Sequence, residues 1–216
     1  MTYQSLNRER LKALLFDLDG TLLDSFSAHL EAYRLMFARF GIQITKESFL
    51  DSYSPNWYET YQAMGLPKEA WESANSYWLE AAAQQTPGLF PDVERILTQL
   101  SGSYKLGLVT SGSKSRVFRD LEHTGIKTIF NTVITGDDVQ QPKPAPEGLE
   151  MALAKLEIQP PEAVYIGDAQ ADYEMAHAAR VQFIGVSSAF ASLKAIDSCP
   201  RVETLAELVT LLRALQ

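Results

Sequence analysis

The chain has little cysteine, an excess of acidic over basic residues and no long apolar run. Cys199 is the one cysteine among 216 residues, so an internal disulfide is excluded and we expect a reducing, cytoplasmic compartment. Lysine and arginine number 19 against 27 acidic residues, a net charge of -8. This balance argues against general nucleic-acid or anionic-membrane binding. No apolar stretch reaches transmembrane length, and the N-terminal residues lack the apolar segment of a signal peptide.

The composition that remains is that of an ordinary globular protein. Hydrophobic residues make up 46% of the chain and charged residues 21%. A chain of 216 residues can form one sizeable core with an appendage, or two small domains.

Short apolar runs alternate with helical patterns through most of the chain. Because the runs are nearly continuous in apolar character, they are typical of central parallel strands that are covered on both faces. Strand and helix alternation predicts an open, doubly wound, Rossmann-like α/β sheet. The carboxyl ends of such strands share one edge, where ligands bind. The runs are 13–15, 106–109, 133–134, 164–166 and 183–186, and the helical patterns follow Ser115, cover 147–156 and follow Glu203.

Residues 24–86 depart from this alternation and predict an all-helical insert. Phe26 to Phe40 has the apolar spacing of a long amphipathic helix, which Gly41 ends. Helical patterns continue over about 46–64 and 67–84, with no convincing strand. Pro87-Gly88 and Pro91 suggest the return hinge. We therefore expect an α/β core domain at 1–23 and 87–216, and a helical domain at 24–86.

Two carboxylates stand at the end of the first apolar run. Residues 16–21 read Phe-Asp-Leu-Asp-Gly-Thr, and strand alternation places Asp17 and Asp19 on the same side. Two like charges this close repel unless a cation lies between them or one keeps its proton. The pair therefore indicates a site for a metal ion and acid chemistry.

Three further polar clusters complement this pair at the ends of other runs. In Thr110-Ser111-Gly112, a hydroxyl and free backbone amides precede a helix start, an arrangement suited to an anion. In residues 141–146, three prolines stiffen the backbone around Lys143. In residues 167–172, Asp168 follows a strand and Asp172 comes four residues later.

In this order and in these strand-end positions, the four clusters resemble the motifs of the haloacid dehalogenase-like hydrolase superfamily. The resemblance covers nearly the whole chain. The helical insert resembles the cap that follows the first strand in subfamily I, as in phosphoglycolate phosphatase-like and beta-phosphoglucomutase-like members. The family's fold is a Rossmann-like core with an inserted cap.

The resemblance implies hydrolysis through an aspartyl-phosphate intermediate. Asp17 is similar to the family's nucleophile and Asp19 to its general acid/base. Thr110 and Lys143 resemble the groups that hold the phosphoryl oxygens. Asp168 resembles the Mg²⁺ ligand, with Asp17 and the Asp19 backbone carbonyl as the other protein ligands. Mg²⁺ suits such an oxygen-only site.

Other candidate residues have alternative roles under the resemblance. Asp172 either binds the metal or orients its waters and Lys143, and we favour the supporting role. His29 resembles in position a histidine of some sugar-phosphate mutases, although a surface or hinge role is the alternative. Further candidates for phosphate binding are Gly20, Ser111 and Gly112. The chain departs from the family pattern at Ala169, where serine is usual, and at Pro142, where glycine is frequent.

The leading functional hypothesis is a Mg²⁺-dependent phosphatase acting on a small phosphorylated metabolite. Asp19 argues against dehalogenation, because a leaving halide needs no proton donor. A phosphosugar mutase is the alternative, which His29 supports. Arg34 and Arg39 are the only arginines of residues 24–86, and neither lies in a loop suited to a second phosphate. A non-catalytic binding module is a third possibility. Substrate identity and oligomeric state stay open.

Overall fold

Short apolar strands form a six-stranded parallel sheet in the part of the chain that the computed structural model describes, residues 10–190 and 199–214. The strand order is β3-β2-β1-β4-β5-β6, and every neighbouring pair is parallel. This confirms the predicted fold class. The strands are β1 (Ala13–Phe16), β2 (Lys105–Val109), β3 (Thr132–Ile134), β4 (Ala163–Gly167), β5 (Gln182–Val186) and β6 (Arg201–Val202).

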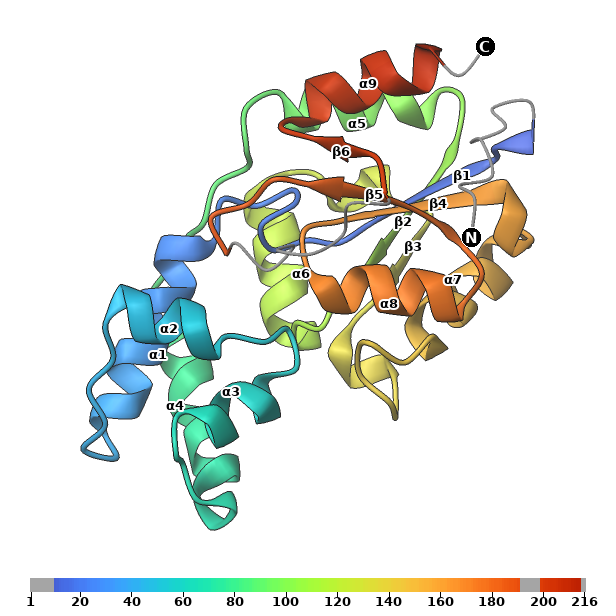
Figure 1. Cartoon of the computed structure of the whole chain (residues 1–216). Helices are drawn as coiled ribbons and strands as arrows, with labels where there is room; N and C mark the ends of the chain where they lie inside the picture. Colours follow the sequence, from blue (N-terminus) through green and yellow to red (C-terminus); the bar gives the residue numbers. More distant parts are fainter. Residues whose placement is uncertain (1–9, 191–198, 215–216) are drawn as a thin grey trace.

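Helices cover both faces of the sheet (Figure 1). Alternation along β1 sends Leu14 and Phe16 into one apolar cluster, and Ala13 and Leu15 into the other. The first cluster includes side chains of α5 (Val93–Ser101), α6 (Lys114–His123) and α9 (Leu205–Ala214). The second includes α7 (Glu147–Leu156) and α8 (Gln170–Ala178). Short 3₁₀ turns lie at Lys68–Ala70, Lys127–Ile129, Gly136–Asp138 and Pro160–Glu162.

The segment between β1 and α5 is helical, as the sequence predicts. It contains α1 (Phe26–Ala38), α2 (Lys46–Ser52), α3 (Trp57–Ala63) and α4 (Trp71–Ala82). Pro55 explains the break between α2 and α3, because the residue before a proline avoids helical geometry. These four helices, called the cap below, pack around a cluster of aromatic rings in which Tyr61, Phe37 and Phe49 are fully buried. The cap lies beside one end of the sheet (Figure 1).

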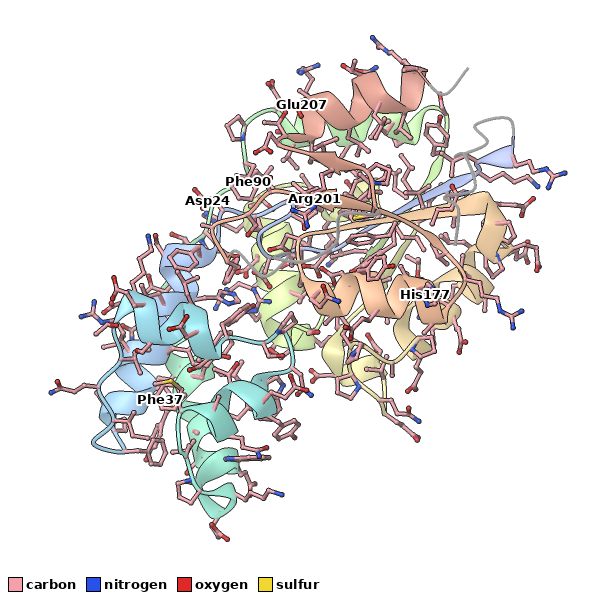
Figure 2. All side chains as sticks on the ribbon, in the orientation of Figure 1. Asp24, Phe37, Phe90, His177, Arg201 and Glu207 are labelled. Atoms are coloured by element: carbon pink, nitrogen blue, oxygen red, sulfur yellow. The ribbon has the colours of Figure 1, made fainter. Side chains whose placement is uncertain are left out.

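Two chain segments run side by side between the cap and the sheet. The Asp24 amide donates to the Gly88 carbonyl at 2.9 Å, and the Phe90 amide donates to Leu22 at 3.0 Å. Figure 2 shows Asp24 and Phe90 next to each other at this junction. The predicted hinge prolines, Pro87 and Pro91, flank the return segment, so the cap is connected to the sheet by two paired chain segments. Among the described helices, none combines the length and apolar character needed to cross a bilayer.

Candidate active site

Most of the predicted site residues line one cavity between the cap and the carboxyl ends of the strands. Asp17 directly follows β1, Thr110 follows β2 and Asp168 follows β4, so the parallel topology gathers them at one edge. Asp19 and Lys143 join them there. Ser111, Gly112 and His29 also line the cavity. The cavity's cap side is formed mainly by aromatic side chains: Tyr33, Tyr53, Trp57, Tyr61 and Trp78.

Two predicted residues lie just behind this lining. Asp172 is fully buried. Gly20 has a φ of +77°, and a Cβ there would overlap the Asp168 carboxylate. Glycine at position 20 therefore lets the backbone turn while Asp168 stays close to the end of β1.

Lys143 is the centre of a buried hydrogen-bond network. Its Nζ donates to Asp17 Oδ1, to Asp172 Oδ1 and to the Tyr165 hydroxyl, each at 2.7 Å. The Tyr165 hydroxyl in turn donates to the Val109 carbonyl at 2.8 Å. The network connects residues of three strand ends and holds the ammonium group directly beside the Asp17 carboxylate.

One ammonium group does not balance the carboxylates around it. Oxygens of Asp17, Asp168 and Asp172 all lie within 4.8 Å of one another. Burial raises the pKa of Asp17 to about 7, against the opposing effect of Lys143 and with further upward shifts from Asp172 and Asp19. Burial and the Asp17 charge also raise the pKa of Asp168 well above its ordinary value. One more positive charge would reduce the repulsion among these carboxylates.

A hard divalent cation fits this donor set. The cluster offers carboxylate oxygens alone, and an oxygen-only set suits Mg²⁺. Asp17 and Asp168 line the cavity. The oxygens of Asp172 are already engaged: Oδ1 accepts from Lys143 and lies 3.2 Å from the Tyr165 hydroxyl, and Oδ2 accepts from the Ala169 amide at 3.0 Å. These contacts favour a supporting role for Asp172.

Asp19 has different partners. Arg116 binds its carboxylate in a two-pronged pair, with Nη1 donating to Oδ1 at 3.0 Å and Nη2 to Oδ2 at 2.5 Å. His29 Nε2 lies 3.1 Å from Oδ1, without the alignment of a hydrogen bond. Burial would raise the pKa of Asp19, but Arg116 and His29 outweigh it and hold that pKa well below the ordinary value. If Asp19 contributes to a metal site, its backbone carbonyl is the atom that is left to do so.

The loop after β2 places at the cavity a backbone turn before a helix start, the kind of segment whose amides bind anions. Thr110 Oγ1 accepts from the Gly112 amide at 3.2 Å, which fixes the turn before α6. The Ser111 hydroxyl is buried and has no hydrogen-bond partner among the described residues. A Cβ at Gly112 would run into the Arg116 guanidinium, so this glycine lets Arg116 lie back across the loop.

Comparison with known proteins decides the family. The family described as "Haloacid dehalogenase-like hydrolase" matches residues 14–186, most of the chain. The chain belongs to the haloacid dehalogenase-like hydrolases. It is 33% identical over 165 residues to "Pyrophosphatase PpaX" of Bacillus velezensis, which covers 74% of this chain and 76% of that protein. The predicted family and enzyme class are thereby confirmed.

Solved structures agree with this membership. A haloacid dehalogenase-superfamily hydrolase of subfamily IA from Geobacter sulfurreducens has a TM-score of 0.68 and 26% identity, and covers 94% of this chain and 97% of its own. A "predicted phosphoglycolate phosphatase" from Haemophilus somnus has a TM-score of 0.83 at 20% identity, with 94% and 98% covered, and shows the shared fold.

In this haloacid dehalogenase-like hydrolase, sequence analysis missed two side chains of the site. Arg116 lies on α6 and pairs with a residue 97 positions away, which no local pattern reveals. The i, i+4 spacing of Arg116 and Asp120 beside the apolar Val117 and Leu121 was an available signal, because it places charges toward the buried side of a helix. Tyr165 gave no such signal, because an aromatic residue in a buried strand is typical of the hydrophobic core.

Proposed function

We propose that this hydrolase is a Mg²⁺-dependent phosphatase that cleaves a small phosphomonoester through an aspartyl-phosphate on Asp17. The observation that carries the proposal is the hydrogen bond of 2.7 Å from Lys143 to Asp17, at a cavity that Asp19 and Asp168 also line. This contact gives a buried carboxylate a fixed cation beside it, where a phosphoryl group would need its charge neutralised.

The chemistry proceeds in two displacements at phosphorus. An Asp17 oxygen forms a bond to phosphorus while the bond to the leaving oxygen breaks. Asp19, after it leaves Arg116 and takes up a proton, gives that proton to the leaving oxygen. Water then attacks the phosphorus, Asp19 takes the water's proton, and the bond to Asp17 breaks to release phosphate. Lys143 and the Thr110–Gly112 loop hold the phosphoryl oxygens. Mg²⁺, held by Asp17, Asp168 and the Asp19 carbonyl, would supply further positive charge to the phosphoryl group.

The cap, taken as residues 24–86 with the remainder as the core domain, would close over the substrate and exclude bulk water. The aromatic side chains on the cap side of the cavity support this role. A small phosphorylated metabolite is therefore the expected partner. The name of the Bacillus velezensis relative supports including pyrophosphate among the candidate substrates.

The test is turnover by the purified protein with Mg²⁺ on a panel of phosphate esters and pyrophosphate. We expect phosphate release that EDTA stops and that excess Mg²⁺ restores. Asp17→Asn should be inactive on every member of the panel, with Asp51→Asn, an exposed cap carboxylate, as the matched control. Absence of turnover on the whole panel, or full activity in Asp17→Asn, would contradict the proposal.

A phosphosugar mutase is the second candidate, because His29 lies 3.1 Å from Asp19 at the cavity. Against it, the two arginines of the cap are engaged elsewhere: Arg34 pairs with Glu31, and Arg39 lies over the Tyr77 ring. Incubation with a bisphosphorylated hexose separates the two. Isomerisation faster than phosphate release would favour the mutase.

A further inference from the structure

Arg116 is a second buried cation of the cavity, and it pairs with other carboxylates than Lys143 does. Its side chain is 4% exposed. It lies 5.9 Å from the centre of the Trp78 ring, which belongs to the cap. The proposed chemistry uses Lys143 for the transferred phosphoryl group and assigns nothing to Arg116. A buried guanidinium at a substrate cavity therefore needs an explanation.

The charges around Arg116 balance only while Asp19 stays with it. Arg116 Nη1 also donates to Asp120 at 3.2 Å, and Asp120 in turn pairs with Arg119 at 2.8 Å. Two arginines thus face two carboxylates, Asp19 and Asp120. When Asp19 turns toward the leaving oxygen of a substrate, the remaining cluster carries one uncompensated positive charge. An anion is the natural replacement.

Buried hydrogen-bond donors without partners belong to residues that line the same cavity. Arg116 Nε, the Trp78 Nε1 and the Ser113 hydroxyl are buried and have no hydrogen-bond partner within the described residues. All three residues line the cavity, and they come from both the core and the cap. Buried donors are normally satisfied, so three orphaned ones at a substrate cavity indicate a missing acceptor.

We infer that Arg116, with Ser113 and Trp78, forms a subsite for an anionic group on the leaving part of the substrate. The subsite takes a compact set of anionic oxygens, either a second phosphate or a carboxylate. Binding there would replace the Asp19 carboxylate on Arg116 and leave Asp19 free to meet the leaving oxygen. The inference rests on the proposed function and narrows it to substrates with a charged leaving group.

The experiment compares leaving groups that differ in charge. Pyrophosphate and phosphoglycolate carry the two anionic alternatives, whereas 2-hydroxyethyl phosphate has a neutral tail of similar size. We expect kcat/KM to be higher for the anionic substrates by about tenfold or more. Arg116→Gln should remove this preference by lowering kcat/KM mainly for the anionic substrates, and Arg116→Lys should keep part of it.

Two further variants keep the test decisive if a protein that has lost the buried Arg116 does not fold. Ser113→Ala removes one orphaned donor from a partly exposed residue and should reduce the preference a few fold, about threefold. Arg95→Gln is the matched control, because Arg95 pairs with Asp92 on the surface and does not line the cavity. It should leave the preference unchanged.

Equal turnover of charged and neutral substrates by the wild type would overturn the inference, and so would a uniform loss on all substrates in Arg116→Gln. Both outcomes leave the phosphatase proposal intact. If the wild type turns over nothing, the proposed function fails and binding decides the subsite separately. Calorimetry with Mg²⁺ should then show methylenediphosphonate binding more tightly than ethylphosphonate in the wild type and losing that advantage in Arg116→Gln. Equal binding of the two would contradict the subsite.

Discussion

Asp17 and Asp19 are two residues apart and line the same cavity, Asp17 buried and Asp19 with its side chain 11% exposed, yet their surroundings are opposite. Asp17 shares one lysine with Asp172 and lies near Asp168, and burial raises its pKa to about 7. Asp19 has both oxygens bound by Arg116, and its pKa is held well below the ordinary value although burial opposes this. Asp17 has too little positive charge nearby, whereas Asp19 has both oxygens bound by a guanidinium that it shares with Asp120.

The two aspartates differ because other elements of the chain place different partners beside each of them. The motif places both carboxylates at the strand end, but Lys143, Asp168 and Arg116 come from three other elements. A deficit of positive charge at Asp17 suits a site that takes up a divalent cation. At Asp19 both carboxylate oxygens accept hydrogen bonds from Arg116, which suits a group that must leave this partner before it transfers a proton.

Exchange of each aspartate for asparagine should have the largest effect. Asp17→Asn removes the proposed nucleophile, so we expect turnover to fall about 10⁴-fold or more. Asp19→Asn should lower turnover by about 10²–10⁴-fold while metal and phosphate binding persist. Steady-state kinetics and phosphate calorimetry measure both. Normal turnover in Asp19→Asn would refute its acid/base role.

Removal of the Lys143 cation should be next in size. Lys143→Met leaves Asp17 and Asp172 buried without their ammonium partner, so we expect a loss of about 3–5 kcal/mol in unfolding free energy. Turnover should fall by about 10²-fold as well. Denaturant unfolding gives the first quantity. Lys12→Met, which breaks an exposed pair with Glu162, is the control and should cost less than about 1 kcal/mol. Equal losses in the two variants would show that the buried network adds nothing special.

Around neutral pH, Mg²⁺ and pH should change the stability through Asp17 and Asp168 rather than through Asp19. Because the folded pKa of Asp17 is raised from 3.8 to about 7, its contribution to stability is present below its ordinary pKa and is lost as pH rises through about 7. Asp168 shifts in the same direction. Asp19 shifts the other way, so its contribution is present above about pH 4 and is lost only on further acidification.

We therefore expect the Tm of EDTA-treated protein to fall between about pH 5 and pH 7.5, and Mg²⁺ to raise Tm by several degrees, more at the higher pH. Differential scanning calorimetry at both pH values measures this. A Mg²⁺ effect that is absent, or equal at the two pH values, would contradict a cation site at Asp17 and Asp168.

Asp172→Asn should have the smallest effect of the series. Its oxygens are engaged by Lys143, Tyr165 and Ala169, so the variant should lower kcat by about tenfold and change Mg²⁺ affinity little. Asp168→Asn is the matched comparison and should lose Mg²⁺ affinity by more than about 100-fold. If the two variants weaken Mg²⁺ binding equally in calorimetric titrations, Asp172 is itself a ligand.

Much of the fold was predictable because its signals are local. The apolar runs of β1 to β5 are short and bounded by glycine or polar residues, and the helix predicted at 147–156 has those bounds as α7. β6 was missed because it is two residues long, and its pairing with β5 depends on how the chain returns to the sheet edge. The break between α2 and α3 follows from Pro55, a signal that was present in the sequence.

The candidate site was predictable as a set of residues but not as a set of partners. Strand-end carboxylates and the single lysine among prolines stand out in the sequence. Arg116 did not, because its importance comes from a contact across 97 positions. Tyr165 likewise appears as an ordinary core residue until the structure places its hydroxyl against Lys143. Local patterns thus identify groups that react, whereas the groups that tune them depend on tertiary packing.

The most direct test of the central claim is peptide mapping by mass spectrometry after acid quench during turnover. The unequal roles of the two aspartates predict one phosphoryl group on the peptide that contains Asp17, linked to that residue by fragmentation and absent in Asp17→Asn. A phosphoryl group on Asp19 would contradict the account, as would turnover that persists in Asp17→Asn with no covalent intermediate.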